Sequence, residues 1–523
     1  MTAALRAFSL AAMGLVICQG LSLLADPAIP KPVPFLLLLL ILPAVVLLLP
    51  VRRSGLFAVL LFTAAFLSKA LLAAALDTQP VSDFAIFHAA ALKLASGDLS
   101  YAADPYFRTW RYQHGIVLYY ATQIRLFGDS LLGMKLINCL WLAGTNMLLY
   151  RMGRLLFGER PARLVAAWYL VWPGTFLLCS VLTNQHVSNF FLLLGMYAAL
   201  RCLTPSEVPF GAPPAGSRPR TTHLRRVLPA CGAGLSLALG NLFRPQGIIV
   251  IAGLFLLVLL RMLPSDASAP SVRLRPDTAR IRLPDTSGLL LCLLPLVAAY
   301  LLAGGLSAGL FRLSGISQDG LGNGFPLWKF VIGLNHETTG QYAEADVKTI
   351  YRIPDAQARD AAARTAIRER LLPLPRLARL FVAKTELMWA GNDNMQWGFS
   401  HLAHATLLIG PLSLSFDPVA KQVLFLERAV ALLPFLLAFA AQGVCLFARR
   451  REPTARLLPI LLFVLYVGMH LFIEVQPRYR DFGMFFVFLA SMEMLSMLPW
   501  FRTVPIMPAD VSAAPASDIS PDA

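Results

Sequence analysis

The stretch VPFLLLLLILPAVVLLLPVRRSGLFAVLLFTAAFLSKALLAAAL, residues 33–76, contains two long apolar runs separated by the pair Arg52-Arg53. A helix that crosses about 30 Å of hydrocarbon needs about 20 apolar residues, and both runs come close to that length. Because no water reaches the membrane interior, a backbone there must satisfy its own hydrogen bonds by forming a helix. The stretch therefore predicts two membrane-spanning helices joined by a short basic turn.

The same pattern recurs along the rest of the chain. Of its 523 residues, 57% are hydrophobic and only 14% are charged, a balance that is not typical of a soluble protein. We predict an all-α polytopic membrane protein, a bundle of about twelve transmembrane helices. The predicted spans are residues 5–24, 33–50, 55–76, 130–150, 162–180, 187–203, 229–243, 246–261, 287–310, 418–447, 455–475 and 481–499.

Basic residues predict the orientation of the bundle, because short cytoplasmic loops are rich in Lys and Arg. Five short connections are basic: residues 52–53, 151–163, 204–228, 262–286 and 448–453. All five share one side of the membrane if the N-terminus is cytoplasmic and residues 115–128 form an interfacial helix. The long segments 77–129 and 311–417 then lie on the extracytoplasmic side.

Residues 1–499 are interpreted as one transmembrane domain that keeps its first apolar segment as an anchor. We expect it in a bacterial inner or plasma membrane with both termini cytoplasmic. Residues 500–523 are predicted to be a disordered cytoplasmic tail. The net charge of +16 is spread over the loops, which does not favour a nucleic-acid-binding surface. The seven cysteines form no C-x-x-C pair, which disfavours a metal cluster or a disulfide framework.

Most unusual polar residues fall on the predicted extracytoplasmic side, which favours a site at the outer interface over a pathway through the bilayer. Asp83 directly follows the third span, at the start of an amphipathic helix. A carboxylate at this place could act as a general base. The alternative is a structural role, in which Asp83 interacts with the helix dipole and Ser82 caps the helix.

The segment HLFIEVQPRYRDFG, residues 470–483, supplies the next candidates at the outer end of the penultimate span. Glu474 lies near the membrane edge, where a carboxylate requires a partner, and Arg478 is four residues away. The Arg478 guanidinium could bind a phosphate and stabilise it as a leaving group. The alternative is a structural ion pair between Glu474 and Arg478.

Two further places carry polar groups on the same side. Asn184 and Gln185 occupy a turn, where they could hydrogen-bond sugar hydroxyls or cap a helix. Arg244 precedes a proline that interrupts an apolar stretch. Its guanidinium could bind a phosphate or extend to lipid headgroups.

The order of these motifs resembles that of the GT-C membrane glycosyltransferases, in particular glycosyltransferase family 39. That family includes protein O-mannosyltransferases and lipid A aminoarabinose transferases. The Ser-Asp pair before an amphipathic helix resembles the first extracytoplasmic loop of the family, which implies that Asp83 is the catalytic or acceptor-orienting carboxylate. Many members have a second acid where this chain has Phe84. The pattern E-x-Q-x-R-Y, residues 474–479, resembles the C-terminal signature of the family.

Two other segments also resemble segments of this family. RYQHG, residues 111–115, resembles a segment of the relatives that contains two prolines, both missing here. Its candidate residues are Tyr112, Gln113 and His114. GLNHETTGQYAEAD, residues 333–346, resembles the pattern G-L-N-x-E-x-x-G-x-Y-N-x-x-D. The residues implied to line a sugar pocket are Asn335, Glu337 and Tyr342. The alternative is a packed loop with its own turn hydrogen bonds.

The resemblance implies a membrane glycosyltransferase of the hexosyl- or mannosyltransferase kind. It would transfer a sugar, with inversion, from a polyprenyl-phosphate donor to an extracytoplasmic lipid, glycan or protein. Asp83 would act on the acceptor, and Arg478, Tyr479 and Arg244 would bind the donor. Relatives often have a second acid where this chain has Asn184 and Gln185, so a divalent-metal site is not favoured.

Two rival functions come from other classes. A transporter or lipid flippase for a cell-envelope precursor would show internal repeats and polar residues inside its spans. Neither stands out, and Lys69 is the one obvious charge deep in an apolar run. A scaffold without catalysis would tolerate the substitution Asp83→Asn, which a catalytic base would not.

The basic connections generate a prediction of sidedness. Single cysteines near positions 83, 340 and 478, in a background without the native cysteines, should react with an impermeant reagent outside intact cells. Cysteines near positions 157, 220, 278 and 450 should be protected. Labelling of position 220 from outside would overturn this orientation.

Overall fold

The fold is described from a computed structural model. It describes residues 2–48, 53–203, 219–262, 286–391, 394–402, 406–409, 412–448 and 454–501. The predicted disordered tail therefore lies outside the described residues from position 502 onward. Parts of the predicted basic loops 204–228, 262–286 and 448–453 also lie outside them.

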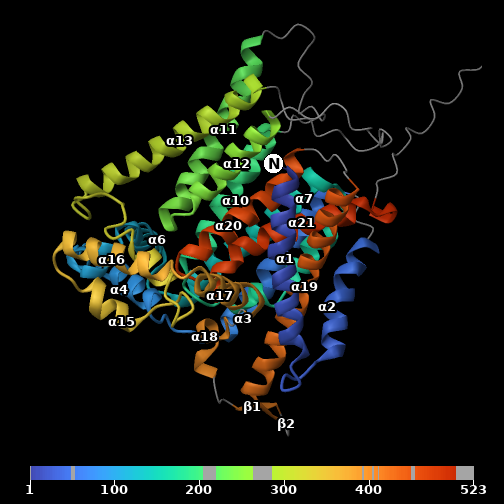
Figure 1. Ribbon diagram of the computed structural model, residues 1–523, viewed down its shortest axis with the longest axis horizontal. Coiled ribbons are helices and arrows are strands. Elements are labelled where there is room, and N and C mark those ends of the chain that lie inside the picture. The colour runs from blue at the N-terminus through green and yellow to red at the C-terminus, as the bar shows by residue number, and fades with distance from the viewer. Residues whose placement is uncertain are drawn as a thin grey trace, which may run out of the picture.

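Each of the twelve predicted spans overlaps a helix (Figure 1), but the predicted span 162–180 continues past the end of α8 at Val171. The helices are α1 (Thr2–Ala25), α2 (Val33–Val45), α3 (Ser54–Ala75), α7 (Leu131–Phe157), α8 (Glu159–Val171), α10 (Asn184–Leu203), α11 (Pro219–Phe243), α12 (Gly247–Met262), α13 (Thr286–Leu313), α19 (Phe416–Phe447), α20 (Leu458–Phe472) and α21 (Arg480–Met497). The prediction of an all-α polytopic membrane protein is confirmed.

Fewer helices than predicted have the dimensions of a full span. Among the described residues, seven are long and apolar enough to cross a membrane: α1, α3, α7, α10, α13, α19 and α20 with the turn before it. The apolar parts of α2, α11 and α12 are shorter. The boundary between α7 and α8 also differs from the prediction, because α7 continues into the basic connection as far as Phe157. Gly158, with φ +97°, then turns the chain into α8.

Short elements gather beside one end of the long helices, where α4, α15 and α16 lie together in Figure 1. The α-helical ones are α4 (Asp83–Ala95), α5 (Pro105–Thr109), α6 (His114–Phe127), α9 (Gly174–Leu177), α14 (Trp328–Gly333), α15 (Glu344–Asp346), α16 (Ala356–Arg370), α17 (Leu374–Thr385) and α18 (Met395–Gly398). The helical turns are η1 (Val46–Leu48), η2 (Ser100–Ala103), η3 (Arg111–Gln113), η4 (Val347–Tyr351), η5 (Glu386–Gly391), η6 (Ser400–Leu402), η7 (Thr454–Leu457), η8 (Pro477–Tyr479) and η9 (Pro499–Phe501). The predicted interfacial segment 115–128 corresponds to α6.

No strands were predicted from the sequence, but the described part of the structure has two. Strands β1 (Thr406–Ile409) and β2 (Leu412–Ser415) form an antiparallel hairpin in which Thr406 pairs with Ser415. The hairpin leads directly into α19 and lies at the edge of the molecule in Figure 1. It does not alter the helical architecture of the rest of the chain.

Glycines allow α10, α11 and α13 to pack closely. A Cβ atom at Gly234 of α11 would lie 2.1 Å from the carbonyl oxygen of Leu296 in α13. A Cβ atom at Gly240 would lie 2.7 Å from the Leu192 side chain in α10. Inside a membrane, where apolar burial does not distinguish a helix from lipid, such close approach is what holds helices together.

The two ends of the bundle have different partners. At the first end, Arg6 of α1 donates a hydrogen bond of 2.6 Å to Gln442 of α19 and lies 3.8 Å from Glu493 of α21. At the other end, α1 finishes beside α17, where Gln19 donates to the carbonyl oxygen of Val382. We call this second end, where α20 ends and α21 begins, the polar end.

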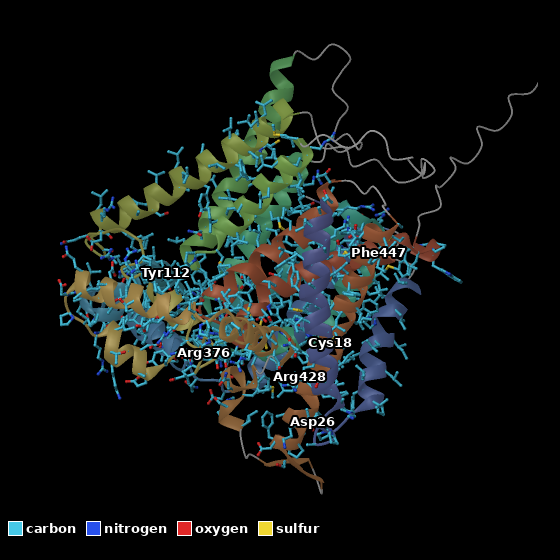
Figure 2. The ribbon with its side chains drawn as sticks, viewed as in Figure 1. Cys18, Asp26, Tyr112, Arg376, Arg428 and Phe447 are labelled. Atoms are coloured by element: carbon cyan, nitrogen blue, oxygen red, sulfur yellow. The ribbon has the colours of Figure 1, made fainter. Side chains whose placement is uncertain are left out.

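Figure 2 shows Phe447, at the finish of α19, and Asp26, just after α1, at opposite ends of the bundle. The basic connection that begins after Phe447 therefore departs from the end opposite the polar one. This arrangement fits the separation of basic and polar segments that the sequence predicts. Which end faces the cytoplasm stays a prediction.

Candidate functional site

Two arginines stack against the same tyrosine at the polar end. The Arg244 guanidinium lies 4.4 Å from the ring centre of Tyr479, and the Arg478 guanidinium lies 5.6 Å from it. Arg478 also lies 4.4 Å from the ring of Trp397 and 4.8 Å from that of Phe84. Aromatic faces attract a cation while leaving its N–H groups available. We call Arg244, Arg478 and Tyr479 the arginine cluster.

Hydrogen bonds to the backbone fix the arginine cluster in place. Gln185 of α10 donates to the backbone carbonyl oxygen of Arg478 (2.8 Å). The hydroxyl of Tyr466 in α20 donates to the backbone carbonyl oxygen of Tyr479 (2.6 Å). The Arg478 Nε donates to the side chain of Gln476 (2.7 Å). The turn η8 is therefore tied to two long helices and to its own chain.

The guanidinium groups keep unused donors. In the described part of the chain, the terminal nitrogens of Arg478 and Arg244 donate no hydrogen bond and join no ion pair. Arg478 is nevertheless buried, with 7% of its surface exposed. Paired guanidinium donors match the oxygens of a phosphate or carboxylate in geometry and charge. The arginine cluster can therefore hold an anion without releasing a protein carboxylate first.

Asp83 is connected to this cluster through Phe84, the residue that follows it. It is the first residue of α4, and the following residue, Phe84, packs under Arg478. Ser82, with φ +54°, makes no capping hydrogen bond through its side chain, so the capping alternative is not observed. The Tyr106 hydroxyl is close to Asp83, and burial together with that negative charge raises the tyrosine pKa. The half-buried Asp83 thus has a neutral neighbour on one side and a cation beyond Phe84 on the other.

Glu474 takes a different partner from the expected one. Its carboxylate pairs with Lys329, just inside α14, and accepts a hydrogen bond of 2.9 Å from Gln476. Burial favours the protonated form, but the Lys329 ammonium outweighs it and lowers the pKa of Glu474. The alternative of a direct Glu474–Arg478 ion pair is therefore wrong, and Gln476 bridges the two side chains instead. Among the described residues, this choice of partner leaves Arg478 without a direct ion pair to a carboxylate.

Lys329 was not predicted as a site residue. It also lies 5.4 Å from the ring of Trp110, and its charge opposes the raised pKa that burial imposes on Tyr112. A lone lysine in the aromatic segment FPLWKF was the available signal. Its proximity to Glu474, 145 residues later, could not be read from that signal.

His114 and Asn184 lie outside the arginine cluster. His114 is 1% exposed and stacks on Phe107, at 5.4 Å between ring centres, and on Phe311. Burial lowers the pKa of His114 to about 4, which keeps it neutral. Asn184 donates to the carbonyl oxygen of Phe243 (2.9 Å), at the end of α11. Both side chains support the elements around the site.

The loop 333–346 forms hydrogen bonds within itself, as expected for the alternative of a packed loop with its own turn hydrogen bonds. Asn335 donates to Asp346 (2.8 Å) and accepts from the backbone of Glu337 (2.9 Å). Glu337 and Tyr342 are exposed, and the Tyr342 hydroxyl donates to Glu344. The loop still frames the site, because its Gly340 carbonyl accepts the backbone N–H of Val475.

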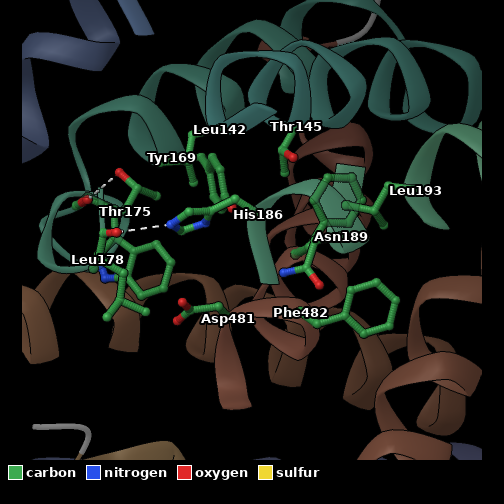
Figure 3. A pocket seen from close by; sticks show the side chains of 13 residues that line it. Leu142, Thr145, Tyr169, Thr175, Leu178, His186, Asn189, Leu193, Asp481 and Phe482 are labelled. Carbon is green, nitrogen blue, oxygen red and sulfur yellow. Dashed lines mark hydrogen bonds between the residues drawn. The ribbon is translucent and has the colours of Figure 1, made fainter. Parts of the chain in front are cut away.

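Asp481 is a second carboxylate near the cluster that sequence reasoning did not select. It lines a cavity of about 20 Å³, together with Thr175, His186 and Asn189 (Figure 3). Among the described residues, buried oxygens of Asp481 and Asn189 have no hydrogen-bond partner. A cavity of this size holds about one water molecule, which could donate to both oxygens. The adjacent Arg480 is not available, because it pairs with Glu427 of α19.

No protein-family model matches the sequence, and no curated protein matches it. A solved structure that is similar is the archaeal oligosaccharyltransferase AglB from Archaeoglobus fulgidus, in complex with an inhibitory peptide and a dolichol-phosphate. The alignment has a TM-score of 0.40 and 13% identity, and it covers 83% of this chain and 50% of that one. The chain thus spans about half the length of that protein, and a TM-score this low carries no argument about function.

The Lys329–Glu474 pair generates a prediction about stability. Lys329→Met should lower the free energy of unfolding by roughly 1–3 kcal/mol at neutral pH, because it leaves a buried carboxylate unpaired. Since the folded pKa of Glu474 lies below its unfolded value, the pair stabilises above the unfolded pKa and loses its effect as pH falls through the folded one. The difference from wild type should therefore shrink under acidic conditions.

Thermal unfolding in detergent between neutral and acidic pH measures this difference. The double variant Lys329→Met/Glu474→Gln should regain stability at neutral pH, because no buried charge is left alone. A single variant as stable as wild type at neutral pH would show that the pair is not stabilising.

Proposed function

We propose that this protein is a membrane glycosyltransferase with a GT-C-like architecture. It would transfer a sugar from a polyprenyl-phosphate donor to an extracytoplasmic acceptor. The observation that carries the proposal is that Asp83 directly precedes Phe84, which packs under Arg478, while the terminal nitrogens of Arg478 and Arg244 have no hydrogen bond among the described residues. A carboxylate next to a site for a phosphate supplies the two groups that such a transfer requires.

The arginine cluster is proposed to bind the donor phosphate. Arg478 and Arg244 would each direct N–H donors to its oxygens, while Tyr479 holds both cations in place. When the bond between the anomeric carbon and the phosphate oxygen breaks, negative charge grows on the phosphate. Donors already positioned at that oxygen stabilise the transition state more than the ground state.

Asp83 is proposed to act on the acceptor. Its carboxylate would accept the proton of an acceptor hydroxyl as the hydroxyl oxygen bonds to the anomeric carbon. The carrier phosphate leaves from the opposite face of the sugar, so the configuration at that carbon inverts. An acceptor that is already an anion needs no base, and Asp83 would then orient it.

The other predicted residues are assigned to supporting positions. Gln185 and Glu474 would hold the segment that carries Arg478, through the contacts described above. Asn184 and His114 would fix the surrounding helices. The exposed side chains of the loop 333–346 would meet the sugar or the acceptor. These are Glu337 and Tyr342, with Asn335 shaping the turn.

Direct assay tests the function. Purified protein in liposomes would be incubated with polyprenyl-phosphate hexoses, mannose among them, and extracted membrane acceptors. Transfer of sugar with loss of the phosphate linkage is the expected result. Movement of intact donor across the bilayer without transfer would favour the flippase alternative.

Asp83→Asn should leave the fold and donor binding nearly intact and reduce turnover. Loss of a positioned general base costs roughly 10²–10⁴-fold in rate. Turnover and donor affinity would be measured on folded protein. Glu369→Gln, which removes an exposed carboxylate from α16, is the matched control and should retain wild-type turnover. Full turnover in Asp83→Asn would remove Asp83 from the catalytic role.

Arg478→Lys keeps a positive charge but loses the paired donors and the planar stacking surface. Donor binding should weaken by about 1–3 kcal/mol, with a parallel loss of turnover. Arg364→Lys, on the exposed face of α16, is the matched control. If Arg478→Lys lowered only the yield of folded protein and left donor affinity unchanged, Arg478 would be structural.

A further inference from the structure

An apolar groove opens on the surface of the bundle, where Phe8 and Val382 are exposed, between α1, α17, η5 and α20. Its volume is about 200 Å³. Thr385 is the one residue among those lining it that carries a hydroxyl, and the others present hydrocarbon or aromatic surface. The residues that define its length are Phe8, Ala12 and Val16 of α1 and Phe463, Val467 and Leu471 of α20.

The spacing of these residues gives the groove its direction. On both helices they recur every four residues, and eight residues of helix rise about 12 Å. Both α1 and α20 are candidate membrane spans, so the groove runs along the direction in which those helices would cross the membrane. A long, narrow apolar groove suits a single hydrocarbon chain, whereas a polar ligand there would leave its hydrogen-bonding groups unsatisfied.

The end of the groove nearest the polar end is different in character. Gln19, one turn beyond Val16 on α1, donates to the carbonyl oxygen of Val382, and in the described structure its own buried side-chain oxygen has no partner. Val382 lines the groove, and Arg379 lies three residues before it on the exposed face of α17. Positive charge and an amide group therefore lie at the mouth of a hydrocarbon-lined groove.

A second exposed arginine extends this basic surface. Arg376 is labelled on α17 in Figure 2, and the neighbouring Leu374 is 67% exposed. Neither Arg376 nor Arg379 has an ion-pair or hydrogen-bond partner among the described side chains. A short helix with exposed leucine and arginine is typical of a segment that lies in the headgroup region of a membrane.

We propose that this groove binds one acyl chain of an anionic phospholipid from the surrounding bilayer. The lipid phosphate lies at Arg379 and Arg376, and the chain lies along α1 and α20. The polyprenyl carrier is not the assigned occupant, because its phosphate is assigned to Arg478 and Arg244. This lipid site is independent of the proposed transfer reaction and survives its failure.

The full-length protein would be reconstituted in nanodiscs of dioleoylphosphatidylcholine with and without dioleoylphosphatidylglycerol. Native mass spectrometry counts the lipid that stays bound. Wild type should retain phosphatidylglycerol in preference to phosphatidylcholine and unfold at a higher temperature in the anionic discs. Equal retention of both lipids would overturn the headgroup assignment.

Two variants address the two parts of the site. Ala12→Phe fills the groove and should abolish retention, while Ala64→Phe, on the exposed face of α3, is the matched control. Arg379→Gln should weaken retention about fivefold, the contribution of one basic side chain near an anionic surface. Arg364→Gln on α16 controls for loss of charge elsewhere. Unchanged retention in Ala12→Phe and Arg379→Gln would refute the site.

A competition experiment identifies the occupant. A polyprenyl phosphate added to the anionic discs should leave the retained phosphatidylglycerol in place. Stoichiometric displacement of phosphatidylglycerol from wild type, but not from Ala12→Phe, would assign the groove to the carrier and overturn the proposal.

Discussion

The backbone between α20 and α21 is the constraint on which the polar end depends. It leaves one long helix and enters another within a few residues, so its carbonyl groups need partners. The Lys384 ammonium donates to the carbonyl oxygens of Leu471 and Ile473. The Gln185 side chain donates to the carbonyl oxygen of Arg478. Each donor comes from a distant element. The segment can therefore hold a fixed shape although its regular structure is limited to the single turn η8.

The shape of the segment between α20 and α21 determines which charged side chains pair with one another. Glu474 pairs with Lys329, and Glu427 pairs with Arg480, so neither of these two carboxylates pairs directly with Arg478. Arg478 is left with aromatic rings as its neighbours. A cation that is buried without a carboxylate favours an external anion more than one that is already neutralised. Thus two structural ion pairs define which arginine remains available to a ligand.

The sequence predicted the helical bundle well because apolar length alone decides whether a segment can span a membrane. It also selected Arg244 and Arg478, which the structure places on the same Tyr479 ring, and Asp83, whose neighbour Phe84 packs against Arg478. It could not predict Lys329, since an ion pair across 145 residues depends on where two loops dock. The surroundings of His114 could not be predicted for a related reason, because a histidine in a loop does not reveal which rings surround it. The β1–β2 hairpin was not predicted, because short strands show little periodicity of apolar and polar residues.

The stacking of Arg478 against Trp397, Phe84 and Tyr479 has a kinetic consequence. An arginine that is held by a carboxylate must exchange one partner for another before it can receive a substrate. The rings hold Arg478 by its face, so an arriving anion meets its edge directly and no bond has to break first. When the anion leaves, no side-chain carboxylate has to return to Arg478. In the proposed reaction, entry and exit of the donor phosphate would then depend on access to that edge of Arg478.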